Sequence, residues 1–118
     1  MANKQESQQF KSLARYIMFS PYKLRPIVDV IRGKGVDYAL NWLATYKTQR
    51  CLPIQKVLKS AAANAKQQGI EELDQLIIKE IKVDQGPTHK YFKPGAMGKA
   101  SVQRRRLSHI SVILESKQ

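Results

Sequence analysis

Hydrophobic positions alternate with polar ones in three stretches of the chain and recur at helical spacing in three others. The alternation predicts strands over residues 11–19, 76–84 and 107–114. Spacings of three and four predict three consecutive helices between residues 20 and 69. Because the helices are grouped between the first strand and the other two, the pattern favours an α+β fold. We expect three helices packed on a small antiparallel three-stranded sheet, with a long protruding β-hairpin arm.

The first helix contains a conflict at Pro26. Ser20-Pro21 is typical of a helix start, because serine caps the first turn and proline tolerates the first position. A proline inside a helix removes one backbone hydrogen bond. Either the helix is kinked at Pro26, or its regular part begins near residue 25. The apolar face of this helix comprises Leu24, Ile27, Val28 and Ile31.

Glycines mark the predicted ends of the helices. The Gly-Lys-Gly triplet at 33–35 ends the first helix, and it lacks the Gly-Lys-Ser/Thr of a phosphate loop. Gly69 ends the third helix, which is predicted to open at Pro53. Trp42 is expected to cover the core from one side of the second helix. The apolar faces of the second and third helices comprise Val36, Ala39, Leu40 and Leu43, then Ile54, Val57, Leu58, Ala61, Ala62 and Ala65.

The last two strands differ in their regularity. In residues 76–84 the apolar phase shifts between Ile78 and Ile81, which predicts a β-bulge or a change of buried face. In residues 107–114 the alternation is regular, and it places Ile110, Val112 and Leu114 on one side.

A basic segment lies between these two strands. Residues 86–106 contain six Lys or Arg and no acid, and they are punctuated by Gly and Pro. A segment of this kind has little to bury, so the strands are predicted to continue into the hairpin arm at about 84–106. A protruding basic arm is suited to burial inside a polyanion.

The net charge of +12 is concentrated at the two ends of the chain. Residues 1–50 carry nine bases and three acids, residues 51–86 carry five of each, and residues 87–118 carry seven bases and one acid. A neutral block therefore lies between two basic segments, as expected of a packed scaffold with charged contact surfaces.

Length and composition indicate one domain. A chain of 118 residues that is 42% hydrophobic can form a core, so we assign residues 10–118 to a single domain and residues 1–9 to a disordered tail. The N-terminus lacks the apolar region of a signal peptide, and no apolar run approaches the roughly 20 residues that span a bilayer. Heptads that would form a dimer are also absent from the sequence. We expect a soluble cytoplasmic protein with no membrane partner that is not a homo-oligomer.

The sequence contains no constellation for catalysis or metal binding. His89 and His109 are the only histidines, and together with the single cysteine, Cys51, they cannot form a structural zinc site of usual spacing. The acids at residues 71–74 cluster at a predicted turn, where solvated carboxylates are typical. We therefore expect no enzyme activity, metal or cofactor.

Several segments resemble, in order and spacing, the bacterial-type large-subunit ribosomal protein twenty-two family. The match is collinear over about residues 11–115. The segments that carry it are Ala-Arg-Tyr-Ile at 14–17, Ser-Pro-Tyr-Lys-Leu-Arg at 20–25, Val-Asp-Val-Ile-Arg-Gly-Lys at 28–34, Lys-Val-Leu-Lys-Ser-Ala-Ala-Ala-Asn-Ala at 56–65, Val-Asp-Gln-Gly-Pro at 83–87, Gly-Lys at 98–99 and His-Ile-Ser-Val-Ile-Leu at 109–114.

The resemblance implies a structural protein of the ribosome, bacterial or organellar, that binds large-subunit ribosomal RNA. It also implies an arm that lines the peptide exit tunnel, with neighbouring ribosomal proteins and the nascent chain as further partners. Carried over by position, the tip of the arm is residues 88–99, and the residues expected to line the tunnel are His89, Lys90, Tyr91, Phe92, Gly95 and Met97. The residues predicted to bind RNA are Lys11, Arg15, Lys23, Arg25, Arg32, Lys34, His89, Lys90, Tyr91, Lys93, Lys99, Arg104, Arg105, Arg106 and His109.

Some of these residues have a second interpretation. The arginines at 104–106 would point alternately to the two faces of a strand. They would form a solvated strand edge, a localisation cluster or, in the interpretation we favour, a phosphate-binding ridge. Tyr91 and Phe92 either form a local cluster with Pro94 or Met97, or stack on unpaired bases. His109 is either a packed, hydrogen-bonded histidine or an RNA contact.

The chain departs from the family pattern at four positions. The family tends to have basic residues at the positions of Tyr91, Gly95 and Met97, and an aliphatic residue at the position of Pro26. The alternative class of protein is a free-standing regulator that binds DNA or messenger RNA. Its usual signature, a helix-turn-helix with bases concentrated on one recognition helix, is absent from the sequence.

Overall fold

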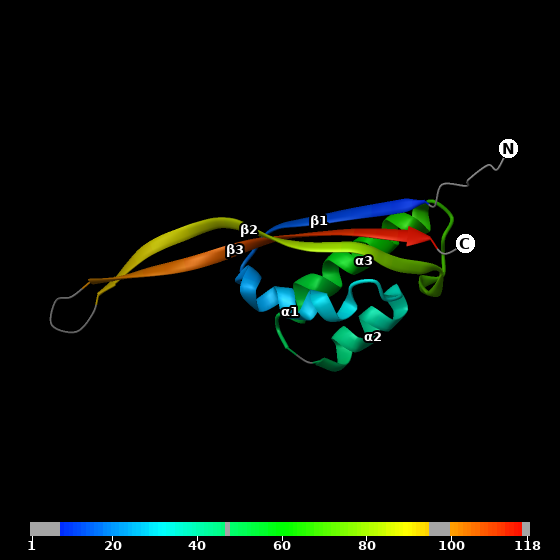
Figure 1. Cartoon of the computed structure of the whole chain (residues 1–118). Helices are drawn as coiled ribbons and strands as arrows, with labels where there is room; N and C mark the ends of the chain where they lie inside the picture. The colour runs from blue at the N-terminus through cyan, green and yellow to red at the C-terminus, as the bar shows by residue number, and fades with distance from the viewer. Residues whose placement is uncertain (1–7, 47, 95–99, 117–118) are drawn as a thin grey trace.

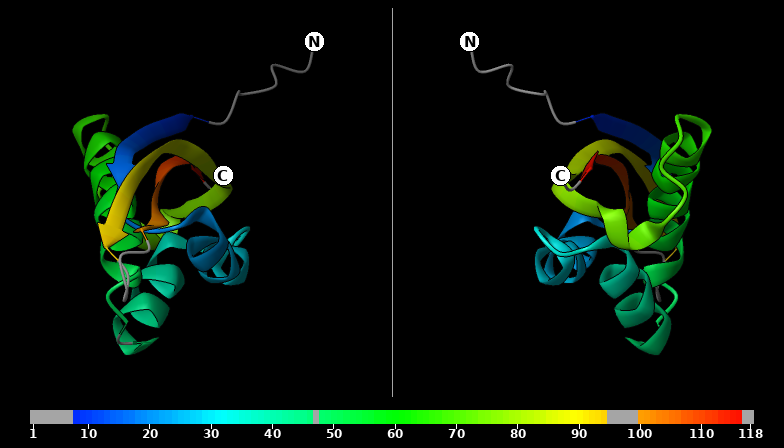
Figure 2. Two further views of the ribbon diagram at one scale, coloured as in Figure 1. Left: turned by 90° about the vertical axis from the view of Figure 1, so that its left-hand side faces the viewer. Right: turned by 90° about the vertical axis from the view of Figure 1, so that its right-hand side faces the viewer.

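Three helices cover one face of a three-stranded antiparallel sheet in the computed structural model of the chain (Figures 1 and 2). The structure describes residues 8–46, 48–94 and 100–116, with side chains except at 89–94 and 100–105. The strands lie in the order β1–β3–β2, and the predicted α+β fold is confirmed. The elements are β1 (Gln9–Ile17), α1 (Pro21–Ile31), α2 (Val36–Tyr46), α3 (Cys51–Gln67), the 3-10 helix η1 (Leu73–Gln75), β2 (Leu76–Pro94) and β3 (Ala100–Ser116).

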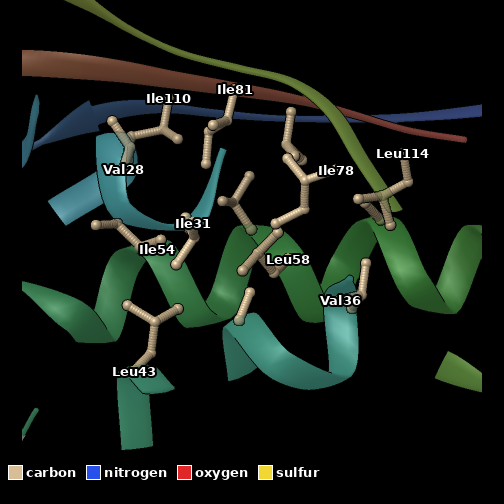
Figure 3. Packing of buried hydrophobic residues seen from close by; sticks show 14 of the residues in the cluster. Val28, Ile31, Val36, Leu43, Ile54, Leu58, Ile78, Ile81, Ile110 and Leu114 are labelled. Atoms are coloured by element: carbon tan, nitrogen blue, oxygen red, sulfur yellow. The ribbon is translucent and has the colours of Figure 1, made fainter. Parts of the chain in front are cut away.

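The core lies between the sheet and the helices (Figure 3). Helix α3 packs against β1 and β3, while α1 packs along β2. Leu58 of α3 is fully buried among side chains from all these layers. The predicted inward faces of the three helices are confirmed, since every residue assigned to them is buried except Leu40, which is partly buried. Trp42 is also partly buried against the core, as expected.

Helix α1 runs through Pro26 without ending there. The Ser20 side chain accepts a hydrogen bond from the Tyr22 N–H at 3.3 Å, and Pro21 occupies the first turn, so the predicted start is confirmed. Gly33 has φ of +79°, and its N–H donates to the Ile78 carbonyl at 3.1 Å. The Gly-Lys-Gly triplet therefore ends the helix and also ties it to β2.

Replacing Pro26 by alanine is expected to stabilise the protein by about 1–3 kcal/mol. The side chain is exposed, so alanine leaves no cavity, and it restores the backbone N–H that a helix interior requires. Urea unfolding of the two proteins would measure the difference. The control is Pro21→Ala at the helix start, where no hydrogen bond is regained, and no stabilisation is expected there. Equal effects at the two positions would contradict the prediction.

Strand β1 begins earlier than the alternation indicates. Gln9 belongs to β1 and the side chain of Phe10 is buried in the core, so the stretch predicted as a tail includes a residue of the sheet. Residues 1–7 of that tail lie outside the described residues. The strand also ends at Ile17, two residues early, and its pairing with β3 shifts register between Ala14 and Ile17. Phe10 is a single buried aromatic residue, and one residue alone adds little to the hydrophobic alternation of the sequence.

Strands β2 and β3 pair along their whole length and form the arm (Figure 1). Their pairing runs from Leu76 opposite Ser116 to Pro94 opposite Ala100, and the molecule measures 74 × 32 × 22 Å. The register shifts once between Ile78 and Glu80, which confirms the predicted bulge, and again between Gln85 and Thr88 at the root of the arm. The core sheet and the arm are thus one continuous ribbon.

Candidate nucleic-acid interface

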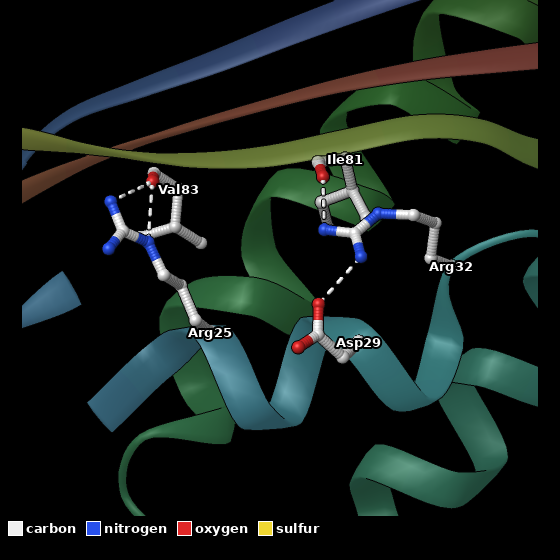
Figure 4. Close-up of polar contacts among 5 residues, drawn as sticks. All are labelled: Arg25, Asp29, Arg32, Ile81 and Val83. Atoms are coloured by element: carbon white, nitrogen blue, oxygen red, sulfur yellow. Dashed lines mark hydrogen bonds and ion pairs between the residues drawn. The ribbon is translucent and has the colours of Figure 1, made fainter. Parts of the chain in front are cut away.

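Two arginines, Arg25 of α1 and Arg32 at its C-cap, attach this helix to the free edge of β2 (Figure 4). Arg25 donates from Nε and Nη2 to the Val83 carbonyl at 3.3 and 3.2 Å. Arg32 donates from Nη2 to the Ile81 carbonyl at 3.0 Å. An edge strand presents unpaired backbone groups, so these contacts satisfy acceptors that would otherwise be open to other chains. Both arginines therefore have a structural role besides the predicted RNA contact.

Arg32 is the more neutralised of the two. Its Nη1 lies 2.6 Å from Oδ1 of Asp29, one turn earlier on α1, and both side chains are exposed. Exposed ion pairs of this type contribute little to stability, about 0–1 kcal/mol. The ion pair with Asp29 instead lowers the net positive charge that a phosphate would meet at Arg32. This net charge is therefore smaller at Arg32 than at Arg25.

Replacing Arg25 by methionine is expected to lower the free energy of unfolding by about 1 kcal/mol, because the Val83 carbonyl loses a charged donor. Methionine keeps most of the aliphatic stem. The matched control is Lys23→Met on the exposed side of the same helix, with an expected change within about 0.5 kcal/mol. Urea unfolding measures both. If Lys23→Met cost as much as Arg25→Met, the hydrogen bonds to β2 would not be the cause.

A tyrosine joins α1 to the root of the arm. The Tyr22 ring has the Arg25 guanidinium 5.6 Å and the Arg106 guanidinium 5.5 Å from its centroid. Both distances are typical of cation–π contacts. No carboxylate forms an ion pair with either arginine among the residues that the structure describes. Two uncompensated guanidinium groups on one exposed ring are suited to binding an anion such as a phosphate.

His109 of β3 contacts Tyr16 of β1. Its Nδ1 accepts a hydrogen bond from the Tyr16 N–H at 3.1 Å, and the two rings meet edge to face with centroids 5.1 Å apart. Tyr16 has φ of +59°, an uncommon backbone conformation that the bulge in β1 requires. A Cβ on Gly86 would lie 3.1 Å from the Leu107 carbonyl oxygen and 3.2 Å from the imidazole, so a larger residue here would require these neighbours to shift by a few tenths of an ångström. His109 is therefore a packed, hydrogen-bonded histidine.

The remaining predicted basic residues with described side chains belong to several elements. Lys11 and Arg15 are exposed on β1, Lys23 is exposed on α1, and Lys34 follows the end of α1. The structure brings only Arg25 and Arg106 together, through Tyr22. The predicted basic block at the N-terminal end is thus distributed over β1, α1 and the turn that follows α1.

The sheet face opposite the helices carries one ion pair near Lys11. Glu80 Oε1 lies 2.8 Å from Lys82 Nζ, and this hydrogen bond lowers the pKa of Glu80 and raises the pKa of Lys82. For a carboxyl with a lowered pKa, stabilisation is present above its unfolded pKa and is lost as the pH falls through its folded pKa. Both groups are exposed, so the pair mainly keeps Lys82 from acting as a free cation at neutral pH.

Most of the predicted arm contacts fall outside the described side chains. For these the structure gives at most the backbone, which pairs Lys90 with Arg104 and Tyr91 with Gln103. Gly95, Met97 and Lys99 lie wholly outside the described residues. The predictions that remain without side-chain geometry are those at His89, Lys90, Tyr91, Phe92, Lys93, Arg104 and Arg105.

Two aromatic residues at the interface were not predicted as functional. Tyr22 and Tyr16 both lie in segments that carry the family resemblance, yet neither was assigned a contact. The spacing of Tyr22 and Arg25, three residues apart on a helix, is a signal that could have found one side of the cluster. No local pattern connects Tyr22 with Arg106.

The described part of the chain shows neither a metal-binding cluster nor a membrane-spanning helix. No group of three His, Cys, Asp or Glu side chains that could hold a metal ion occurs within the described ranges. No helix there is long and apolar enough to cross a membrane. Cys51 is buried at the start of α3, where its sulfur lies 3.3 Å from the Thr48 hydroxyl.

Comparison with known proteins decides the family. The family model described as "Ribosomal protein L22p/L17e" matches residues 12–115. The chain belongs to the Ribosomal protein L22p/L17e family. It is 49% identical over 111 residues to the large ribosomal subunit protein uL22 of Desulfitobacterium hafniense strain Y51, which covers 94% of this chain and 97% of the relative. It is 45% identical over 108 residues to uL22 of Pelotomaculum thermopropionicum, which covers 92% and 96%.

A third relative, uL22 of Geobacter sulfurreducens, is 45% identical over 103 residues, or 87% of this chain and 93% of its own length. These relatives are bacterial proteins, so the resemblance to the bacterial-type family is confirmed. The L22p/L17e family consists of ribosomal proteins of the large subunit and is not an enzyme family.

Proposed function

We propose that this protein is a structural, RNA-binding constituent of the large ribosomal subunit in the cytoplasm. Residues 10–118 act as a single RNA-binding domain that contacts large-subunit ribosomal RNA, and the arm lines the peptide exit tunnel. Neighbouring ribosomal proteins and the nascent chain near the arm tip are its other partners, and it does not form homo-oligomers. The observation that carries the proposal is the arm, a continuous β2–β3 ribbon whose residues 86–106 hold six bases and no acid.

The shape of the arm supports a surrounding partner. Beyond the point where β1 ends, no third strand pairs with β2 or β3 among the described residues, and the helices lie against the core part of the sheet (Figure 1). An isolated two-stranded hairpin is at best marginally stable in water. RNA packed on both sides would neutralise its charges and hold its position.

The root of the arm supports phosphate binding in particular. Arg25 and Arg106 converge on Tyr22, while Arg25 also remains anchored on β2. This anchoring fixes one guanidinium before RNA arrives, which lowers the entropy lost on binding. A phosphate at this point would bridge the globular part and the arm.

The first test is a sucrose-gradient run of lysate that contains the tagged full-length protein, after a moderate-salt wash. We expect stoichiometric tag in the large-subunit and monosome peaks. Tag that remains at the top of the gradient would contradict the ribosomal proposal, and a free nucleic-acid-binding regulator would become the leading interpretation.

At the arm tip we expect the ring of Tyr91 or Phe92 to stack on an unpaired nucleobase of the RNA. This contact would replace the pairing with phosphate that a lysine or arginine at this position would give. Stacking contributes roughly 1–3 kcal/mol per base. Tyr91→Ala should therefore increase the chemical reactivity of RNA near the tip in assembled subunits. Tyr91→Phe, which keeps the ring, is the matched control and should leave reactivity low. Unchanged reactivity in Tyr91→Ala would remove the stacking hypothesis for this residue.

A further inference from the structure

A pocket opens between the end of β1 and the start of α3, and none of the residues that line it belongs to the cluster around Tyr22. Its volume is about 460 Å³, within the range of about 300–1,000 Å³ that is usual for ligand sites. Residues 14 and 16–19 form one wall, and residues 49, 52, 53 and 56 form the other. We refer to it as the β1–α3 pocket. Its lining is mostly apolar and aromatic.

Three large side chains of this pocket remain exposed to solvent. Tyr16, Met18 and Leu52 are 61%, 63% and 54% exposed. Ala14 packs against the core, and regular strand alternation would turn Tyr16 to the same face. The register shift between Ala14 and Ile17 gives this inward position to Ile17, which packs against the core instead. The bulge in β1 therefore leaves the Tyr16 ring at the surface.

The ring of Tyr16 is held in place without a partner molecule. It meets the His109 imidazole edge to face with planes at 88°, and the Tyr16 backbone N–H donates to the same imidazole. Because these contacts restrict the ring, stacking of a flat group on it would cost little conformational entropy. The β1–α3 pocket thus offers a preformed aromatic wall.

The charge on the two walls has one sign. Of the described residues that line the pocket, Lys56 is the one that carries a charge, and it forms no ion pair within the described part of the chain. Residues 8–20 and 48–67, which include all of β1 and α3, contain six Lys or Arg and no acid. Asp84, opposite His109 on β2, lies two strands from β1 and does not line the pocket. The pocket therefore favours an anionic partner.

An unpaired nucleotide of RNA combines a flat apolar ring with an anion. Its base can stack on Tyr16 and lie against Leu52, while a phosphate next to it can reach Lys56. An apolar peptide segment would satisfy the lining of the pocket but leave Lys56 without an anion. We propose that the β1–α3 pocket holds an unpaired nucleobase of large-subunit ribosomal RNA, with Lys56 at the adjoining phosphate. This inference rests on the proposed function and adds to it a contact with a base.

The test uses full-length tagged protein in which Met18 or Leu52 is replaced by the photo-crosslinking residue p-azidophenylalanine. Large subunits are isolated on a sucrose gradient after a moderate-salt wash and irradiated, and the crosslinked nucleotides are mapped by reverse transcription. We expect both positions to crosslink to ribosomal RNA at the same nucleotide or at adjacent ones. The control is Leu73→p-azidophenylalanine, an exposed site on η1 that does not line this pocket, from which this product should be missing.

Each outcome bears on a separate claim. Crosslinks to protein alone, no crosslink, or the same RNA product from position 73, all in subunits that contain the tagged protein, would overturn the pocket proposal and leave the proposed function intact. If the tagged protein without any substitution were missing from the large-subunit peak, both proposals would be overturned.

Binding of the isolated full-length protein to large-subunit ribosomal RNA gives a second readout that does not depend on assembly. Leu52→Ala should weaken binding about three- to tenfold with an unchanged salt slope, because it removes apolar contact and no charge. Lys56→Gln should instead make the log–log salt slope shallower by about 0.7–0.9. The matched control, Leu73→Ala, should change neither quantity, and circular dichroism checks that all three variants fold. Unchanged affinity in Leu52→Ala would overturn the proposal.

Discussion

Truncation of Leu58 to alanine is expected to lower the free energy of unfolding by about 2–5 kcal/mol. Leu58 is fully buried at the centre of the core, between the sheet and the other helices (Figure 3). Alanine loses the transfer free energy of the removed carbons and leaves a cavity that the rigid sheet above α3 can fill only in part. A domain of this size is stable by about 5–15 kcal/mol, so this loss would unfold a substantial fraction of the isolated protein on mild heating.

Urea unfolding followed by circular dichroism would measure the change. Lys59→Ala, at the next position on the exposed side of α3, is the matched control and should change stability by less than about 0.5 kcal/mol. A Leu58→Ala protein as stable as the Lys59→Ala control would mean that α3 does not pack on the sheet as described here.

Replacing Arg104, Arg105 and Arg106 together by glutamine is expected to weaken binding of the isolated protein to large-subunit ribosomal RNA steeply. This expectation rests on the proposed function. Each neutralised phosphate contributes a log–log salt slope of about −0.7 to −0.9, so three lost contacts should make the slope shallower by roughly 2–3. Binding titrations between low and moderate salt would measure it.

The matched control removes the same number of charges from α3 by replacing Lys56, Lys59 and Lys66 with glutamine. We expect a smaller change in slope, because these lysines lie on the globular part and not on the arm. Equal changes of slope in the two triple variants would show that RNA binding depends on net charge alone. Such a result would contradict the proposal that the arm makes the phosphate contacts.

The elements of the fold could be predicted because their signals are local. Helix α3 is an example: its apolar face repeats every three to four residues, and Gly69, with φ of +98°, follows its end. The helix nevertheless begins at Cys51, two residues before the Pro53 that was expected to open it. Ends of elements are determined by capping and by contacts with other segments, and neither is visible in the hydrophobic period.

The candidate site could be predicted only as a set of charges. From the sequence alone, Arg25, Arg32 and Arg106 are candidates because of their positive charge, and His109 is either packed or bound to RNA. The structure shows that Arg25 and Arg32 donate to carbonyls of β2, and that His109 accepts from Tyr16. Which role a cation has depends on its neighbours in space, and these belong to other elements.

The α+β class, the basic arm between two strands and the resemblance to the ribosomal family can all be inferred from the amino-acid sequence. Periodicity, charge sign and motif order are properties of neighbouring residues, and they need no knowledge of long-range contacts. The folded chain additionally places Tyr22 between Arg25 and Arg106, and it anchors Arg25 on the carbonyl of Val83, 58 residues away. Such contacts form when packing of the whole core brings distant segments together, so no local pattern in the chain encodes them.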